Sequence, residues 1–382
     1  MKRRDFLKAG LAGTASALIG TSACARTLQY AAAEPFTFPP PVYRTLGRTG
    51  LKISVVSFGA MLTPEAEVMQ YAFDHGINYV DTARRYMGGR NEEIVGRALK
   101  GRRSKVYVAT KIPHYSQSKE AIFKDVETSL KELSTDYIDV IQLHSLSNRS
   151  LIYNSEIREA LARLKEQGKV RFFGVTTHTN QAQVLNALLE DKDKFFDTAL
   201  VAYNFKSGNE LKETIAAAAK HKIGIIAMKT QAGGYATDKL GPISPHRAAL
   251  KWVLQDTNVT AAIPGMRDMS ELREDVGVMG LKLTYFDELI LKRYGAAVQP
   301  YFCHFCEKCE PTCPHGVAIG TINRCLMYAE AYRAKELSRT TYSEVPASAS
   351  ASVCLDCETC VAKCVHGLNI AAKMARARKL LA

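Results

Sequence analysis

Residues 78–86 read Asn-Tyr-Val-Asp-Thr-Ala-Arg-Arg-Tyr, a short apolar run that ends in a carboxylate and is followed by a tyrosine. Between residues 42 and 295, similar β-branched runs alternate with segments long enough for helices. Eight of these runs are expected to be strands: 53–57, 78–81, 106–110, 138–143, 170–176, 198–202, 224–228 and 260–263. Eight strand–helix units in roughly 250 residues predict an α/β fold and match the count of a (β/α)8 barrel. The same periodicity also fits an open, doubly wound sheet.

Four side chains suited to proton transfer follow three successive expected strands. Asp81 ends the second strand and Tyr86 comes shortly after it, Lys111 follows the third strand, and His144 follows the fourth. In a barrel, the carboxyl ends of the strands meet at one face, where active sites form. We therefore expect Tyr86 to be the general acid for a carbonyl oxygen, with a pKa lowered by the neighbouring Lys111 cation. Asp81 is expected to hold Lys111, and His144 to orient the carbonyl oxygen.

The sequence around these residues resembles the aldo-keto reductase family over nearly all of residues 42–295. The matching stretches are 43–50, 78–86, 91–93, 109–111, 136–144 and 263–265. The resemblance implies a closed (β/α)8 TIM barrel and an oxidoreductase that reduces a small carbonyl substrate or oxidises an alcohol. It also implies a nicotinamide cofactor, NADP(H) or NAD(H), and a catalytic tetrad of Asp81, Tyr86, Lys111 and His144.

The cofactor-binding positions only partly follow the family pattern. The resemblance places them at Thr176, Thr177, Met228, Lys229, Gly265, Arg267, Glu271 and Asp275. Thr177 stands where an asparagine is usual, Leu200 where a glutamine is usual, and Glu271 where an arginine often holds the 2′-phosphate. Either the cofactor binds through altered contacts or as NAD(H), or the barrel takes its electrons from another source.

Eight of the ten cysteines lie in two blocks after the expected barrel. They are Cys303, Cys306, Cys309 and Cys313, and then Cys354, Cys357, Cys360 and Cys364. Both blocks have the C-x2-C-x2-C-x3-C spacing of bacterial ferredoxins, so residues 296–382 are expected to form a small ferredoxin-like domain of helices and loops with two 4Fe-4S clusters. In such two-cluster proteins the fourth cysteine of each run binds the other cluster, which pairs Cys313 with the second block and Cys364 with the first. Disulfides and zinc fit less well, because zinc pairs leave two cysteines of each block unused.

The role of the expected clusters has two interpretations. They relay single electrons, in which case a redox protein partner is expected, or they are a structural staple in place of the family's C-terminal loop. A rival hypothesis for the whole chain is an electron-transfer or partner-binding module whose barrel no longer binds a dissociable nicotinamide.

Residues 1–33 are expected to be a targeting segment. Arg3-Arg4 is followed by Asp5-Phe6-Leu7-Lys8 and a weakly apolar run, which resembles a twin-arginine export signal. The run is too short and too rich in glycine for a transmembrane span. The expected destination is the periplasm or cell envelope, and Cys24 leaves a lipid anchor open. The net charge is +13, but no basic run is interleaved with aromatics, so no nucleic-acid partner is expected.

Overall fold

The computed structural model describes residues 37–113, 118–237 and 240–381. Residues Phe38–Ala382 form one compact unit. The expected targeting segment and Cys24 lie outside the described residues. Within the described ranges, no helix has both the length and the apolar character needed to cross a membrane.

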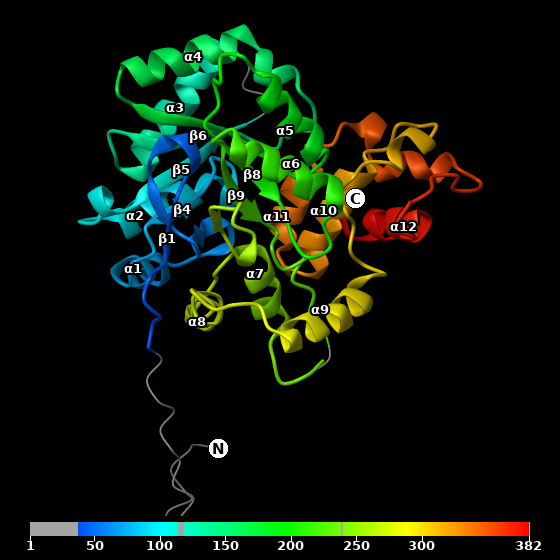
Figure 1. The fold of residues 1–382 in the computed structure, drawn as a ribbon. Helices are drawn as coiled ribbons and strands as arrows, with labels where there is room; N and C mark the ends of the chain where they lie inside the picture. The colour runs from blue at the N-terminus through cyan, green and yellow to red at the C-terminus, as the bar shows by residue number, and fades with distance from the viewer. Residues whose placement is uncertain (1–36, 114–117, 238–239, 382) are drawn as a thin grey trace, which may run out of the picture. The chain divides into compact units, whose positions relative to one another are not determined.

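A parallel sheet of eight strands, hydrogen-bonded in chain order, forms the centre of this unit (Figure 1). The strands are β3 (Phe58–Gly59), β4 (Tyr79–Asp81), β5 (Tyr107–Ile112), β6 (Ile138–Leu143), β7 (Val170–Thr177), β8 (Thr198–Ala202), β9 (Gly224–Met228) and β10 (Ala261–Ala262). Parallel bridges from Val56 to Ala262 and from Gly59 to Gly265 join the two ends of the sheet. The sheet therefore curls onto itself, which confirms the predicted barrel over the open alternative.

One helix follows each strand of the barrel. These helices are α1 (Ala66–Asp74), α2 (Asn91–Leu99), α3 (Lys119–Leu133), α4 (Ser155–Glu166), α5 (Gln181–Glu190), α6 (Asn209–Lys220), α7 (Pro245–Gln255) and α8 (Met269–Val276). Side-chain caps mark several of their starts: Ser118 accepts from the Ala121 amide, and Asn154 accepts from the Ile157 amide. Such caps satisfy backbone donors that the first helical turn leaves free.

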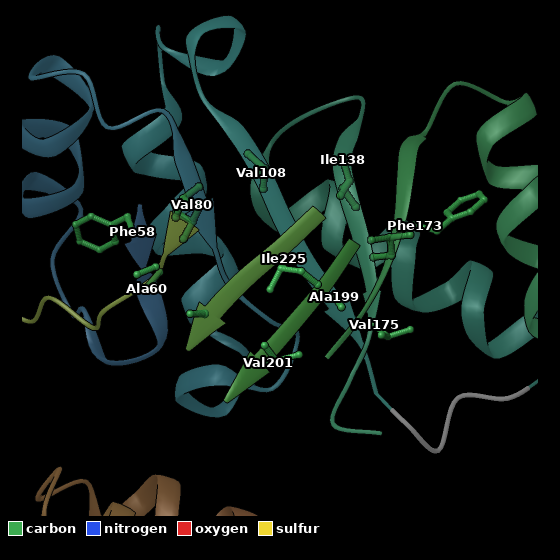
Figure 2. Close-up of a cluster of buried hydrophobic side chains, with 14 of the residues drawn as sticks. Phe58, Ala60, Val80, Val108, Ile138, Phe173, Val175, Ala199, Val201 and Ile225 are labelled. Atoms are coloured by element: carbon green, nitrogen blue, oxygen red, sulfur yellow. The ribbon is translucent and has the colours of Figure 1, made fainter. Parts of the chain in front are cut away.

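Side chains along the strands alternate between two apolar layers, as a period of two residues requires. Val80 and Ile225 belong to the large cluster between the strands and the helices, and Figure 2 shows both within it. Their neighbours Tyr79 and Ile226 belong to a smaller cluster inside the barrel. The barrel is therefore filled by side chains and has no open channel.

An N-terminal hairpin closes the end of the barrel where the strands begin. It consists of β1 (Tyr43–Thr45) and β2 (Lys52–Ser54), which are antiparallel. Leu46 between them is fully buried and joins the interior cluster. The expected first barrel strand, 53–57, is only partly confirmed: its first two residues pair in this hairpin, Val56 bridges Ala262 of the barrel, and β3 begins at Phe58.

The C-terminal segment packs directly on the barrel. It follows α9 (Tyr285–Val298) and contains α10 (Ile319–Glu330), α11 (Lys335–Tyr342) and α12 (Ile370–Leu381). Its own core includes Ile322, Leu326 and Met374, with Cys303, Cys313, Cys354 and Cys364 packed against it. A second cluster joins Tyr235 and Tyr294 to Phe302 and Tyr328. These aromatic contacts attach the segment to the barrel.

We expect Leu46→Ala to lower the free energy of unfolding by about 2–5 kcal/mol, because the variant leaves a cavity in the closed end of the barrel. Urea unfolding followed by circular dichroism measures the change. The matched control is Leu281→Ala, at a leucine that is 49% exposed, and we expect its urea midpoint to stay at the native value. Equal midpoints for both variants would show that the hairpin does not seal the barrel.

Candidate active site

Asp81 and Lys111 form a buried ion pair at the carboxyl ends of β4 and β5. The Lys111 Nζ donates to Asp81 Oδ1 and to the Thr82 carbonyl oxygen, the latter at 2.6 Å. The Gln142 Nε2 donates to Asp81 Oδ2 at 2.9 Å. Burial raises the pKa of Asp81 and lowers that of Lys111, while the attraction between the two charges opposes both shifts. Two of these hydrogen bonds hold the ammonium group, and the third fixes the carboxylate that pairs with it.

Tyr86 and His144 lie next to this pair. Tyr86 begins a 3-10 turn (Tyr86–Gly89) after β4, and its ring centre is 4.7 Å from the Lys111 Nζ. The His144 ring meets the Tyr86 ring edge-on, with 5.9 Å between the centroids. The structure thus brings the four predicted residues together at one end of the barrel, while their catalytic roles remain predictions.

The pKa of Tyr86 shifts in the direction opposite to the one expected from sequence. Burial raises this pKa well above its usual value, and the negative charge of Asp81 raises it further, whereas Arg324 partly offsets the rise. The expected lowering by Lys111 does not dominate because its ammonium group is neutralised by Asp81. Tyr86 therefore keeps its proton at neutral pH.

Two cavities meet at Tyr86. The first is a cleft over the ends of β9 and β10, lined by Met228, Lys229, Gly265 and other residues, and Asp81 and Tyr86 reach its inner end. The second has a volume of about 330 Å³ and is lined by Tyr86 and His144 on the barrel side. Its remaining wall comes from the C-terminal segment, including Arg324 and Tyr328. The phenol side chain is thus accessible from two directions.

The sequence and the fold are similar to those of known proteins. The aldo/keto reductase family model matches residues 62–242, and the oxidoreductase YqkF of Bacillus subtilis is 32% identical over 211 residues, which cover 51% of this chain and 67% of YqkF. The chain belongs to the aldo/keto reductase family. It is therefore an oxidoreductase with a family barrel at its centre.

This chain matches two further relatives over nearly the whole length of each relative. L-Galactose dehydrogenase of Arabidopsis thaliana is 28% identical over 303 residues, which cover 67% of this chain and 94% of that protein. An aldo-keto reductase from Klebsiella pneumoniae, solved in complex with NADPH, is 25% identical with a TM-score of 0.57. The match covers 66% of this chain and 95% of the Klebsiella protein.

Six of the eight residues expected to bind the cofactor line the cleft of this aldo/keto reductase. They are Met228, Lys229, Gly265, Arg267, Glu271 and Asp275. Thr176 and Thr177 are buried and engaged elsewhere: the Thr176 hydroxyl accepts from the Ser145 amide at 2.7 Å, and the Thr177 hydroxyl donates to the Thr179 carbonyl at 2.6 Å. Their expected hydrogen bonds to the cofactor would require these bonds to be exchanged.

The cleft has open backbone at Gly265 and acidic side chains at Glu271, Glu274 and Asp275. A Cβ placed on Gly265 would meet no atom within 4 Å, so the backbone there is open to a ligand. The Glu271 carboxylate accepts hydrogen bonds from both the backbone amide and the side chain of Arg267. Burial raises the pKa of Asp275 well above its usual value, and its two acidic neighbours raise it further. The 2′-phosphate of NADP(H) would therefore lie near acidic side chains, and Arg267 is already paired with Glu271.

Lys229 is an unusual base at the floor of the cleft. Its Nζ lies 4.6 Å and 4.9 Å from the ring centres of Tyr328 and Tyr332 on α10 and just after it. Burial lowers its pKa to about 7, helped by the positive charges of Arg324 and Lys111. Aromatic faces attract a cation, but here they do not compensate fully for the lost hydration.

The first cysteine block has one member of the second block beside it. Burial raises the pKa of the Cys303 thiol to about 12, and negative charge on Cys309, Cys306 and Cys364 adds to the rise. Cys364 also contributes to the raised pKa of the Cys309 thiol. The proximity of Cys364 to the first block is the crossed arrangement expected from the ferredoxin spacing.

The second block shows the reciprocal arrangement. Burial raises the pKa of the Cys354 thiol, and Cys357, Cys313 and Cys360 contribute in the same direction. Within the described ranges, no three His, Cys, Asp or Glu side chains lie close enough to hold a single metal ion. A 4Fe-4S cluster places one cysteine on each of four irons, so its sulfurs stand further apart than the ligands of one ion. The grouping fits such clusters, and their presence remains a prediction.

Three residues of the site were not identified from the sequence. Gln142 on β6 donates a hydrogen bond to Asp81. Ser145, in the loop after β6, is hydrogen-bonded to His178. Arg324 on α10 donates to Ser145. The Arg324 Nη1 donates to the Ser145 hydroxyl at 2.8 Å, although 179 residues separate them. A single arginine on the otherwise buried middle of α10 was the available signal, since charged residues are rare on such faces.

We expect the free energy of unfolding to rise between about pH 7 and pH 10.5 because of Lys229. Its pKa falls from 10.5 to about 7 on folding, so the unfolded chain holds more protons in this window, and the group contributes about 1.4 kcal/mol per pH unit. Lys229→Met should remove this contribution. Urea unfolding near both ends of the window, with the exposed Lys100→Met as control, measures it. A native pH dependence in Lys229→Met would contradict the assignment.

Proposed function

We propose that this aldo/keto reductase reduces a small carbonyl compound to its alcohol, with Tyr86 as the general acid. The carrying observation is that Tyr86 lines both the cleft over β9 and β10 and the second cavity. A substrate in the second cavity and a cofactor in the cleft would both reach the phenol side chain. The reverse oxidation uses the same residues, with the tyrosine as the base.

The residues of the chain have distinct roles in this proposal. Tyr86 donates its proton to the carbonyl oxygen, and its raised pKa keeps that proton in place until the oxygen becomes basic. Lys111, fixed by Asp81, then stabilises the phenolate that forms. His144, in the wall of the second cavity, orients the carbonyl oxygen.

The proposed cofactor is a nicotinamide nucleotide, held along Met228, Lys229 and Gly265. When bound, this cofactor supplies the hydride of the reduction. The NADPH complex of the Klebsiella relative supports this cofactor class. The Arg267–Glu271 pair supports NAD(H) over NADP(H), because Glu271 repels an additional phosphate and occupies the nearby arginine.

We also propose that residues 296–382 bind two 4Fe-4S clusters. The crossed grouping of Cys364 with the first cysteine block and Cys313 with the second supports this arrangement. Cluster chemistry moves single electrons, so a redox protein is the proposed partner of this segment. The paired arginines at Arg3-Arg4 support export through the twin-arginine pathway to the periplasm or cell envelope, a route that carries proteins with their clusters already inserted.

Tyr86→Phe is expected to lower kcat for aldehyde reduction by about 10²–10⁴-fold, because the ring stays and only the proton donor is lost. Steady-state kinetics with NADH and with NADPH measure the change, and nucleotide binding should match the native protein. The matched control is Tyr285→Phe, on a tyrosine that is 69% exposed. Retained activity in Tyr86→Phe would exclude the mechanism, and binding of neither nucleotide would favour the electron-transfer module.

Cys364→Ser and Cys313→Ser are each expected to lower the iron content from about eight to about four atoms per chain, because each removes one ligand from one cluster. Iron analysis of anaerobically purified protein, together with electron paramagnetic resonance after reduction, measures the loss. Cys325→Ala is the control, since this buried thiol belongs to neither block. The same iron content in all three variants would refute the crossed ligation.

A further inference from the structure

Arg324 brings a positive charge to the second cavity and forms no ion pair with a carboxylate among the described residues. Its Nη1 donates to the Ser145 hydroxyl at 2.8 Å, and Ser145 directly follows His144. Its Nε is buried and has no hydrogen-bond acceptor among the described residues. A guanidinium group placed beside a catalytic histidine in this way is only partly satisfied.

The acidic residues of the same cavity each bond to a group other than Arg324, although the charge of Arg324 does act on Glu307. Glu307 accepts from the Asn180 Nδ2 at 2.5 Å, and Glu310 accepts from the Gly320 amide at 2.8 Å. Glu344 pairs with Arg85 at 2.8 Å. Glu307 therefore offsets the charge of Arg324 in part, but no hydrogen bond joins the guanidinium group to a carboxylate among the described residues.

The charge of Arg324 acts on the ionisable groups around it. Together with burial it lowers the pKa of His178 and of Lys229, and it opposes the rise in the pKa of Tyr86. A partly buried guanidinium group with an unsatisfied donor is costly, and a bound anion would supply the missing acceptor. The cavity therefore favours an anionic ligand next to Tyr86.

We propose that Arg324 binds a carboxylate of the substrate, so that the enzyme reduces short oxo acids to hydroxy acids. This inference rests on the proposed carbonyl reduction at Tyr86 and names its substrate class. A planar guanidinium group matches a carboxylate through paired hydrogen bonds. The cavity of about 330 Å³ is near the small end of ligand sites, which span about 300–1,000 Å³. Glu307 and Glu310 in its wall disfavour a doubly charged phosphate.

A purely structural role for Arg324 makes a different prediction. If the Ser145 contact only attached α10 to the barrel, its loss would impair every substrate to a similar degree. If Arg324 binds a substrate carboxylate, its loss impairs charged substrates and spares neutral ones of the same length. The ratio of the two kcat/KM values separates the two roles.

The test compares 4-oxobutanoate with butanal on the full chain with its native iron content. Arg324→Leu is expected to lower kcat/KM for 4-oxobutanoate by about 10–100-fold and to change that for butanal by less than about threefold. If Arg324→Leu does not fold, Arg324→Gln replaces it, because glutamine keeps a donor for Ser145 but has no charge. We expect the same changes in kcat/KM for this variant. Arg376→Leu is the control, because Arg376 pairs with Glu330 outside the cavity and its side chain is 53% exposed.

A binding measurement keeps this inference separate from the proposed reaction. Equilibrium dialysis with 4-hydroxybutanoate and with butan-1-ol reports the carboxylate contribution even if neither aldehyde is turned over. Failure of turnover alone would overturn the carbonyl reduction. Equal effects of Arg324→Gln on both aldehydes would overturn the carboxylate site, and so would unchanged binding of 4-hydroxybutanoate.

Discussion

The closure of the barrel is the constraint on which the remaining structure depends. The Ser57 amide donates to the Ala262 carbonyl at 2.9 Å, and the Gly59 amide donates to the Pro264 carbonyl at 3.0 Å. A Cβ at Gly59 would lie 2.7 Å from two carbonyl oxygens, so only glycine permits this approach. Once the sheet closes, the carboxyl ends of all strands face one another. Residues far apart in the chain, such as Lys111 and Lys229, are then brought to one site.

The C-terminal segment completes that site and is not an appendage to it. Arg324 and Tyr328 form part of the cavity wall beside Tyr86, while α10 also packs on the core that holds several of the cysteines. One helix thus connects the proposed cluster ligands to the proposed substrate site.

Charge is distributed unequally across the site. The Asp81–Lys111 pair is neutral as a unit and is fixed by further hydrogen bonds, which hold the ammonium group beside the Tyr86 ring. Burial and the negative charge of Asp81 raise the pKa of Tyr86, and Arg324 opposes that rise only in part. The barrel therefore sets both the position and the protonation state of the phenol.

The sequence by itself determined the alternation of strands and helices, the order of the four proposed catalytic residues and the spacing of the cysteines, because each is a local pattern along the chain. That periodicity did not separate a closed barrel from an open sheet, and only the family resemblance favoured the barrel. It placed the first strand too early, since the apolar run from Ile53 serves both the hairpin and the barrel. Only the tertiary structure decided the raised pKa of Tyr86, the Gln142 support of Asp81 and the contact of Arg324 with Ser145. Burial and long-range contacts set these features, and neither can be read from neighbouring residues.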